Sequence, residues 1–433
     1  MDILTSNDQI GAYPASWYNA TAKPLAEFPA AGGKLKCDVC IVGAGYTGLS
    51  AALHLARDGY DVILLDAHRV GFGASGRNGG QVGTGQRVEQ DALEKMVGLD
   101  HARSLWDISL ESVQLVRDLI ADNLIDCDFV DGIIHADHRA RFVAESHSYA
   151  AKLGNEYGYE KIRAVDQEEM RHLVGSPAYF GGTLDMGGGH IHPLRFAIGL
   201  ARAAQSAGVR IFEKSRVTSL IETPVAKVRT DQADISASHV VLACNGYLGR
   251  LQSKVAARVM PINNFIAATE PLGDTQAKEL IRENHAVADS KFVINYFRLS
   301  KDKRLLFGGG ESYGYKFPND IAGLVRKPMV EIFPQLKDVQ IDYAWGGTLG
   351  ITMNRMPHFA RLQGNVISSS GYSGHGIAMA TLGGKLAAMA IAGQAEKFDF
   401  MANVPTHKFP GGVTMRWPLL VLAMVWFSLR DRL

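Results

Sequence analysis

The sequence predicts an α/β fold with a largely parallel sheet, into which a second, α+β domain is inserted. Three observations support this prediction. A strand, a glycine turn and a helix follow one another near the N-terminus, the same order recurs near the C-terminus, and strand-rich stretches lie between them. A chain of 433 residues is long enough for two domains with a sizeable core.

The first pattern, residues 38–48, is a buried strand that enters a G-x-G-x-x-G turn and then a helix. Gly43 permits the tight turn, Gly45 lets the backbone approach a pyrophosphate, and Gly48 lets the helix pack closely on the strand. A second predicted strand ends at Asp66, about twenty residues further on, where a carboxylate accepts hydrogen bonds from an adenosine ribose. The set predicts a dinucleotide bound to a Rossmann-like domain but does not separate NAD from FAD.

The glycine-rich stretch 69–81 comes next and is predicted to be neither a helix nor a paired strand. So bare a backbone is suited to lie against a flat ring system. A flexible surface loop is the alternative, but it gives no reason for Arg77 and Asn78 among the glycines.

The pattern near the C-terminus consists of a strand at 365–370, a turn at 371–376 and a helix at 377–392. It offers a second helix N-terminus, whose dipole suits the negative charge of a reduced flavin. The alternative is an ordinary helix cap with a core histidine at His375.

With these motifs, the chain resembles the D-amino-acid oxidase/glycine oxidase superfamily of FAD enzymes. The loop around Arg77 and Asn78 and the turn from Gly371 to Gly376 are the most specific motifs. Within the superfamily, the likeness is greatest to members that act on γ-glutamylputrescine. The matching segments are 37–55, 71–81, 187–194, 304–310, 371–376 and 409–412.

The resemblance implies a domain order and a set of site residues. Residues 36–105, 193–254 and 351–433 would form the FAD-binding domain, residues 106–192 and 255–350 a mainly antiparallel substrate domain, and residues 1–35 an N-terminal extension. The expected cofactor-binding residues are Gly43, Gly45, Thr47, Gly48, Asp66, Ser75, Gly76, Arg77, Asn78, Gly79, Gly80, Val217, Gly371, Tyr372, Gly374, His375 and Gly376.

The implied chemistry is removal of a hydride from a carbon that bears an amine, with FAD as acceptor, followed by hydrolysis of the imine to an aldehyde. The expected substrate is the terminal primary amine of γ-glutamylputrescine or a close γ-glutamyl-polyamine, with molecular oxygen reduced to hydrogen peroxide and ammonia released. An apolar wall would favour the neutral amine. The candidates for the wall and the chemistry are Tyr296, Trp345, Tyr372 and His375, each of which could equally be a core residue.

Departures from better-known relatives sharpen these expectations. Leu306 and Gly310 stand where sarcosine oxidases of the superfamily place a lysine and a histidine, and the lysine assists oxygen reduction there. Residues 345–347 lack the cysteine that tethers flavin in those enzymes, so we expect non-covalent FAD. Residues 347–350 lack the arginine that binds a carboxylate next to the reacting amine. Two alternatives stay open: a dehydrogenase that passes electrons to a membrane quinone, and a non-catalytic FAD-binding protein.

Composition and charge exclude other classes. With 45 Lys+Arg against 44 Asp+Glu, bulk charge indicates no nucleic-acid-binding surface. The N-terminus lacks a secretory pattern, and a cytoplasmic location is expected. Residues 417–429 are apolar but about half as long as a membrane span, so we expect a packed or surface helix, with contact to a membrane surface as the alternative. His190 and His192 could share a metal, but no third ligand is near in the sequence, and no metal is expected.

Overall fold

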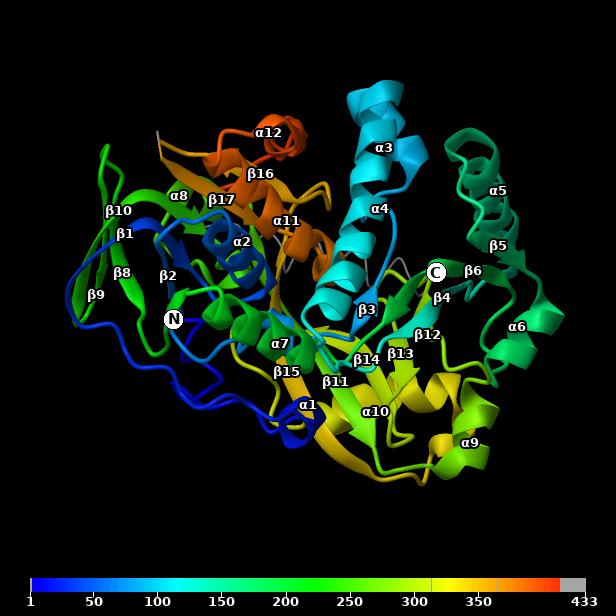
Figure 1. Ribbon diagram of the computed structural model, residues 1–433. Coiled ribbons are helices and arrows are strands. Elements are labelled where there is room, and N and C mark those ends of the chain that lie inside the picture. The colour runs from blue at the N-terminus through cyan, green and yellow to red at the C-terminus, as the bar shows by residue number, and fades with distance from the viewer. Residues whose placement is uncertain (1, 313, 364, 413–433) are drawn as a thin grey trace.

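A computed structural model describes residues 2–312, 314–363 and 365–412, which form two sheets covered by helices (Figure 1). The first sheet lies beside helices α2, α11 and α12, whereas the second lies beside α9 and α10. The predicted fold class is confirmed, because a mainly parallel sheet and a mainly antiparallel one occur together.

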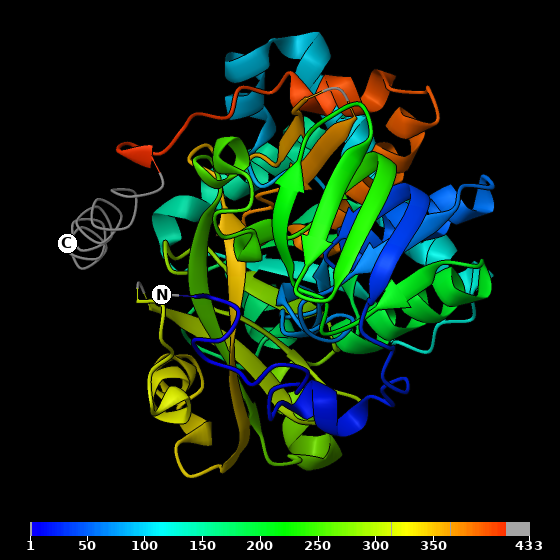
Figure 2. The same cartoon turned by 90° about the vertical axis from the view of Figure 1, so that its left-hand side faces the viewer.

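The first sheet has a parallel core in the order β17–β10–β1–β2–β7. Strand β16 closes one edge in antiparallel fashion, and β8 and β9 extend β10 as an antiparallel ribbon (Figure 2). Both faces of the parallel core are covered, which explains why all four residues of β2 are apolar and buried. The bounds are β1 Gly33–Val42, β2 Val62–Leu65, β7 Arg210–Phe212, β8 Val217–Ile221, β9 Ala226–Thr230, β10 Ala233–Leu242, β16 His358–Arg361 and β17 Val366–Ser370.

Four helices share one core with a face of this sheet: α2 (Tyr46–Arg57), α4 (Leu99–Asp122), α7 (Pro193–Ser206) and α11 (Gly376–Ile391). Helices α2 and α11 approach very closely, since a Cβ on Gly384 would lie 2.3 Å from the carbonyl oxygen of Thr47. This contact brings the two glycine turns of the sequence to one place. The smaller helices of this part are α3 Gln90–Val97, α8 Ser253–Ala256 and α12 Glu396–Ala402.

The second sheet runs in the order β15–β11–β14–β13–β12–β4–β6–β3, with β5 also paired to β6. Its neighbouring strands are antiparallel except for β12 and β4. Its strands are β3 Gln81–Val82, β4 Val130–Ala136, β5 Ile162–Val165, β6 Gly182–His190, β11 Met260–Thr269, β12 Ala286–Asp289, β13 Tyr296–Leu299, β14 Leu305–Ser312 and β15 Ile341–Ile351. Its helices are α5 Ala140–Tyr157, α6 Gln167–Leu173, α9 Gly273–Leu280 and α10 Ile321–Ile332.

Three sequence expectations need correction. Gln81 lies in β3 and pairs with β6, so the end of the glycine stretch is a paired strand that joins the second sheet, although it falls within segment 36–105. Residues 292–295 precede β13 and are not part of it. The N-terminal extension contains a short helix, α1 (Trp17–Thr21), capped by Ser16, and its last residues already belong to β1. The remaining domain boundaries stay a prediction.

Within the described ranges, no helix is long and apolar enough to cross a membrane. The apolar segment 417–429 lies outside these ranges.

Candidate active site

A cavity of about 1530 Å³ lies between the two sheets and is lined by residues of both. It opens at the carboxyl ends of β1, β2 and β10, where nucleotides bind in open parallel sheets. Its volume exceeds the ~300–1,000 Å³ of most small-molecule pockets. There is room for a dinucleotide and a further ligand.

The first glycine turn forms one end of this cavity, and the backbone leaves no room there for larger residues. Gly43 has a φ of +106°, and a Cβ on it would lie 2.8 Å from the carbonyl oxygen of Ala243. A Cβ on Gly48 would lie 1.8 Å from the carbonyl oxygen of Gly43. Gly45 precedes α2 and offers no capping side chain, so the helix N-terminus is available to an anionic ligand.

Asp66 braces this turn. Its two carboxylate oxygens accept hydrogen bonds from the backbone N–H of Ala44 at 2.7 Å and from that of His68 at 2.7 Å. Burial raises the pKa of Asp66 to about 6, and the two amide donors oppose that shift. A carboxylate has about four lone-pair sites, so Asp66 retains acceptor capacity for a hydroxyl in the cavity. Val217 lines the same end.

Arg77 joins three parts of the chain at the glycine loop. Its Nε donates to the carbonyl oxygen of Phe72 at 2.7 Å, and its Nη1 donates to Gly346 O at 3.2 Å and to the Asp8 carboxylate at 3.1 Å. The guanidinium also lies 4.2 Å from the centre of the Phe72 ring. Arg77 therefore holds the loop against β15 and the N-terminal segment.

Asn78 and Ser75 stabilise the loop internally. The amide nitrogen of Asn78 donates to Ala74 O at 2.9 Å and Ser75 O at 3.0 Å, while its oxygen accepts from Gly80 N at 2.8 Å. Ser75 Oγ accepts from the N–H of Tyr46, the first residue of α2. The polar side chains of this loop thus fix its shape.

The N-terminal segment covers part of the cavity, which the sequence did not reveal. Residues 2–4 line it, and Leu4 O contacts His68 Nε2 at 2.7 Å. Asn7 accepts a hydrogen bond from Phe317 N at 2.8 Å, and Asp8 pairs with Arg77. A segment expected to be a simple extension is tied to both sheets.

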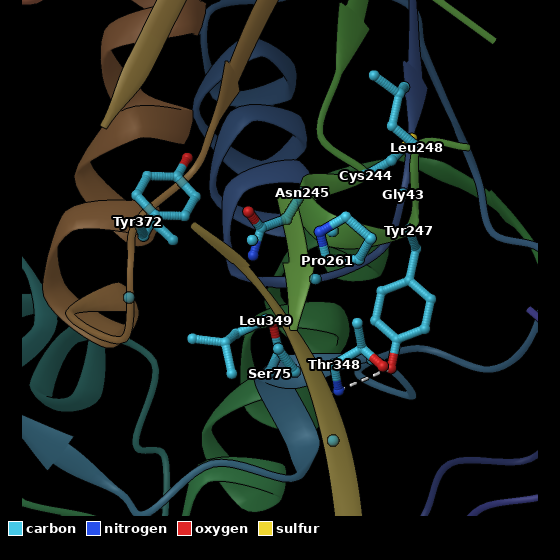
Figure 3. Close-up of a pocket in the computed structure, with 18 of the residues that line it drawn as sticks. Gly43, Ser75, Cys244, Asn245, Tyr247, Leu248, Pro261, Thr348, Leu349 and Tyr372 are labelled. Atoms are coloured by element: carbon cyan, nitrogen blue, oxygen red, sulfur yellow. Dashed lines mark hydrogen bonds between the residues drawn. The ribbon is translucent and has the colours of Figure 1, made fainter. Parts of the chain in front are cut away.

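Tyr372 uses its hydroxyl for packing. The hydroxyl is hydrogen bonded to Thr47 Oγ1 at 2.7 Å and to Ser369 Oγ at 2.8 Å, and burial raises its pKa to about 12. These bonds link the start of α2 to the end of β17. Only the ring of Tyr372 remains for the cavity wall (Figure 3).

His375 stands immediately before α11 and lines the cavity. Its Nε2 is buried and has no hydrogen-bond partner among the described residues. Burial, followed by the positive charge of Arg87 and by His135, lowers the pKa of His375 to about 4. His375 is therefore neutral at neutral pH, and it is held close to the chain after β3, since a Cβ on Gly83 would lie 2.7 Å from its Cε1.

Tyr296 lines the cavity, whereas Trp345 does not. The Tyr296 hydroxyl donates to the side-chain oxygen of Asn264. Its ring packs between Gly79 and Gly308, where added Cβ atoms would lie 2.6 Å and 2.0 Å from ring atoms. The indole of Trp345 is buried, packs 5.1 Å from the ring centre of Tyr18 and donates to Arg77 O at 3.0 Å. The expectation that Trp345 forms part of the wall is wrong.

The expected cofactor residues fall into two groups. Four shape the cavity without lining it: Gly48, Gly76, Gly80 and Gly371. The others line it directly: Gly43, Gly45, Thr47, Asp66, Ser75, Arg77, Asn78, Gly79, Val217, Tyr372, Gly374, His375 and Gly376.

Several lining residues were missed. Asn245 follows β10 with a φ of +45°, and its side-chain oxygen accepts from Gly371 N at 2.9 Å. Tyr247 accepts from Thr348 N at 3.3 Å (Figure 3). The asparagine directly after a strand was a usable signal, because Asn tolerates this left-handed conformation. Arg87, His135 and Arg355 line the cavity from three separate elements, so no local pattern could have grouped them.

The site fits FAD. The glycine turn, the two helix N-termini of α2 and α11 and the braced glycine loop suit a pyrophosphate and a flat ring. No group of three metal-ligand side chains occurs in the part of the chain that the structure describes. His190 Nε2 contacts Asn284 O at 2.8 Å and His192 Nε2 contacts Thr21 Oγ1 at 3.0 Å, so the two are engaged separately.

Comparisons with known proteins agree with this geometry. The gamma-glutamylputrescine oxidoreductase of Escherichia coli is 42% identical over 97% of this chain and 99% of its own length. The probable oxidoreductase OrdL of Rhizobium meliloti is 42% identical over 96% and 97%. The crystal structure of glycine oxidase from Geobacillus kaustophilus has a TM-score of 0.70 at 19% identity, covering 83% of this chain and 95% of that one. The model of the family described as FAD dependent oxidoreductase matches residues 38–390, and the chain therefore belongs to this family of FAD-dependent enzymes.

Proposed function

We propose that this protein oxidises the terminal primary amine of γ-glutamylputrescine, or of a close γ-glutamyl-polyamine, to an aldehyde. With oxygen and water as co-reactants, the other products are ammonia and hydrogen peroxide. The observation that carries the proposal is the single cavity, which runs from the glycine turn at Gly43 to a wall from the second sheet that includes Tyr296. Near-full-length similarity to the gamma-glutamylputrescine oxidoreductase of Escherichia coli supports the substrate.

Bound FAD supplies the hydride acceptor, and the protein has to present the amine in its neutral form. An alkylamine has a pKa near ~10, so at neutral pH a proton must be lost. The ring of Tyr296 gives an apolar wall, and His375 contributes no positive charge because burial lowers its pKa to about 4. Arg87 in the same cavity is a permanent cation that disfavours an ammonium ion nearby.

We also propose that FAD is held without a covalent bond. Of the four cysteines, Cys37, Cys40 and Cys127 are buried and do not line the cavity. Cys244 lines the end near the glycine turn, where its thiol donates to Val42 O at 3.3 Å and burial raises its pKa to about 12. A neutral thiol is a poor nucleophile. After denaturation and precipitation of the protein, FAD should remain in the supernatant; flavin in the pellet would contradict the proposal.

The test of function is turnover by the purified holoenzyme. Under air, γ-glutamylputrescine should yield peroxide, ammonia and aldehyde in equal amounts. Under anaerobic conditions the same compound should bleach the flavin absorption bands, whereas sarcosine, glycine and D-amino acids should not. Flavin that stays oxidised after anaerobic addition of γ-glutamylputrescine rules out the proposed substrate.

A second candidate is a dehydrogenase that passes electrons to a quinone. Leu306 favours it, because this residue of β14 is 3% exposed, packs with Trp345 and offers no positive charge for oxygen reduction. Reoxidation of the reduced enzyme distinguishes the two: rapid reoxidation by air supports the oxidase, whereas slow reoxidation that a soluble quinone accelerates supports the dehydrogenase. The cytoplasmic location expected from the sequence stays a prediction.

A further inference from the structure

Three cationic side chains line the cavity on the side of the second sheet and the following turn: Arg87, Lys291 and Arg355. They come from the chain after β3, the chain after β12 and the turn between β15 and β16. Arg87 is exposed to the cavity and forms no hydrogen bond or ion pair with any residue in the described ranges. A guanidinium with five free donors is available to a ligand.

The backbone around Arg87 is held in place on both sides. Thr84 donates to the carboxylate of Asp185. Gln86 Nε2 donates to Leu105 O at 2.9 Å, and Gln90 Nε2 donates to Ala102 O at 2.9 Å. The neighbours of Arg87 are thus bound to the second sheet and to α4, and they leave its side chain in the cavity.

Arg355 is held in an unusual backbone conformation. Its φ is +65°, which costs a non-glycine residue ~1–2 kcal/mol. The turn is fixed by Arg355 N, which donates to Thr352 O at 3.2 Å, and by Asn354 Nδ2, which donates to Pro405 O at 2.6 Å. Burial and then the positive charge of Arg355 lower the pKa of Arg87, so the two guanidinium groups act on each other.

The positive charge at this end is not balanced by a free carboxylate. Asp289 lines the cavity, but its oxygens accept hydrogen bonds from Asn295 N at 2.9 Å, Asn295 Nδ2 at 2.8 Å and Lys291 N at 3.2 Å. Glu89 is close in sequence to Arg87 but does not line the cavity. The side chains at this end therefore favour an anion.

We propose that Arg87, together with Arg355, forms a carboxylate subsite that holds the end of the substrate remote from the reacting amine. The planar fork of an arginine matches a carboxylate in a bidentate manner. This inference rests on the proposed function, because the γ-glutamyl group carries its α-carboxylate at the end opposite to the terminal amine. It also assigns the residues that distinguish a γ-glutamyl-polyamine from a free polyamine.

The test compares two substrates across matched variants. One substrate is γ-glutamylputrescine, and the other carries a carboxamide in place of the α-carboxylate. In Arg87→Gln, kcat/KM for the carboxylate substrate should fall about 10- to 100-fold, mainly through KM, because a charge-assisted hydrogen bond is lost. The carboxamide substrate should change less than about 2-fold, since it cannot use the charge. Arg87→Lys should recover part of the loss.

Arg202→Gln is the matched control, because Arg202 is exposed on α7 and does not line the cavity. It removes the same charge and should leave both substrates unchanged. Arg355→Gln provides a second variant should Arg87→Gln fail to retain FAD. Equal losses for the two substrates in Arg87→Gln, or no loss for either, overturn the subsite.

Calorimetric titration with glutarate separates this inference from the proposed function. Glutarate carries carboxylates but no amine, and it should bind the wild type and bind Arg87→Gln at least 10-fold more weakly. If γ-glutamylputrescine is not oxidised while glutarate binding still depends on Arg87, the subsite stands and the substrate is wrong. Undetectable binding to the wild type, or equal binding to both proteins, overturns the subsite whatever the turnover shows.

Discussion

The two ends of the cavity are built in different ways. At the glycine turn, backbone atoms set the shape, and polar side chains such as Asp66 and Asn78 are hydrogen bonded within the chain. At the other end, Arg87 has no recorded hydrogen bond and His375 Nε2 has no partner among the described residues. The first end is completed by its own sequence, whereas the second leaves polar groups for a ligand. Changes at the first end should affect FAD retention, and changes at the second should affect catalysis with FAD still bound.

The largest expected effect is that of Gly48→Ala at the first end. The added Cβ would lie 1.8 Å from the carbonyl oxygen of Gly43, so the turn has to shift. We expect purified protein without flavin and a loss of about 1–3 kcal/mol in the free energy of unfolding. Flavin absorbance per protein and denaturant unfolding measure both. Gly32→Ala is the control, since nothing lies within 4 Å of its added Cβ; equal flavin content in the two variants would contradict the account.

Asp66→Asn should weaken FAD binding about 10- to 100-fold. The substitution replaces a carboxylate oxygen that accepts from Ala44 N or His68 N by a donor, which leaves one buried amide without its acceptor. Titration of the apoprotein with FAD measures the change, and kcat at saturating FAD should be retained. Asp118→Asn, at an exposed position of α4, should have no effect. A fall in kcat with unchanged FAD affinity would remove Asp66 from the first end.

The difference between the two ends also explains what the sequence could predict. The turn from Gly43 to Gly48 and the acid at Asp66 belong to one strand–helix–strand unit, so their spacing shows their purpose. The Arg77–Asn78 loop was recognised for the same reason, although the bonds of Arg77 to Asp8 and Gly346 depend on the fold. The fold was predicted to a similar extent, since the parallel strands follow from apolar runs.

The substrate end could not be read in this way. Arg87, His135 and Arg355 meet only because β3, β4 and the turn after β15 surround one cavity. Trp345 was misplaced because the pleat of a strand does not reveal which face meets a cavity and which meets a core, and Trp345 faces the core. The helix α1 escaped notice because its five residues are too short for a periodic pattern.

His375 allows a pH test of the second end. Its pKa is about 4 in the folded protein against about 6.5 in an unfolded chain, so the unfolded state takes up its proton first as the pH falls. Stability should therefore decline from pH 6.5 towards pH 4, by on the order of 2 kcal/mol more in the wild type than in His375→Gln. Denaturant unfolding at several pH values measures the difference. Parallel pH curves for the two proteins would show that His375 titrates normally.

The smallest expected effect on turnover is that of Tyr372→Phe. The loss of hydrogen bonds to Thr47 and Ser369 should cost about 1–2 kcal/mol of stability. Because the hydroxyl is engaged in these bonds, kcat and its pH profile should stay within about 2-fold of the wild type. Steady-state kinetics checks this, and a fall of 100-fold or more would return the hydroxyl to the chemistry.

The most direct test of the two-ended cavity is a crystal structure with FAD and γ-glutamyl-butylamide, which has the carboxylate of the proposed substrate but no terminal amine to oxidise. The account predicts the pyrophosphate at the turn from Gly43 to Gly48, the flavin ring beside Tyr296 and His375, and the carboxylate on Arg87 and Arg355. A carboxylate bound away from both arginines, or FAD bound away from the glycine turn, would contradict it.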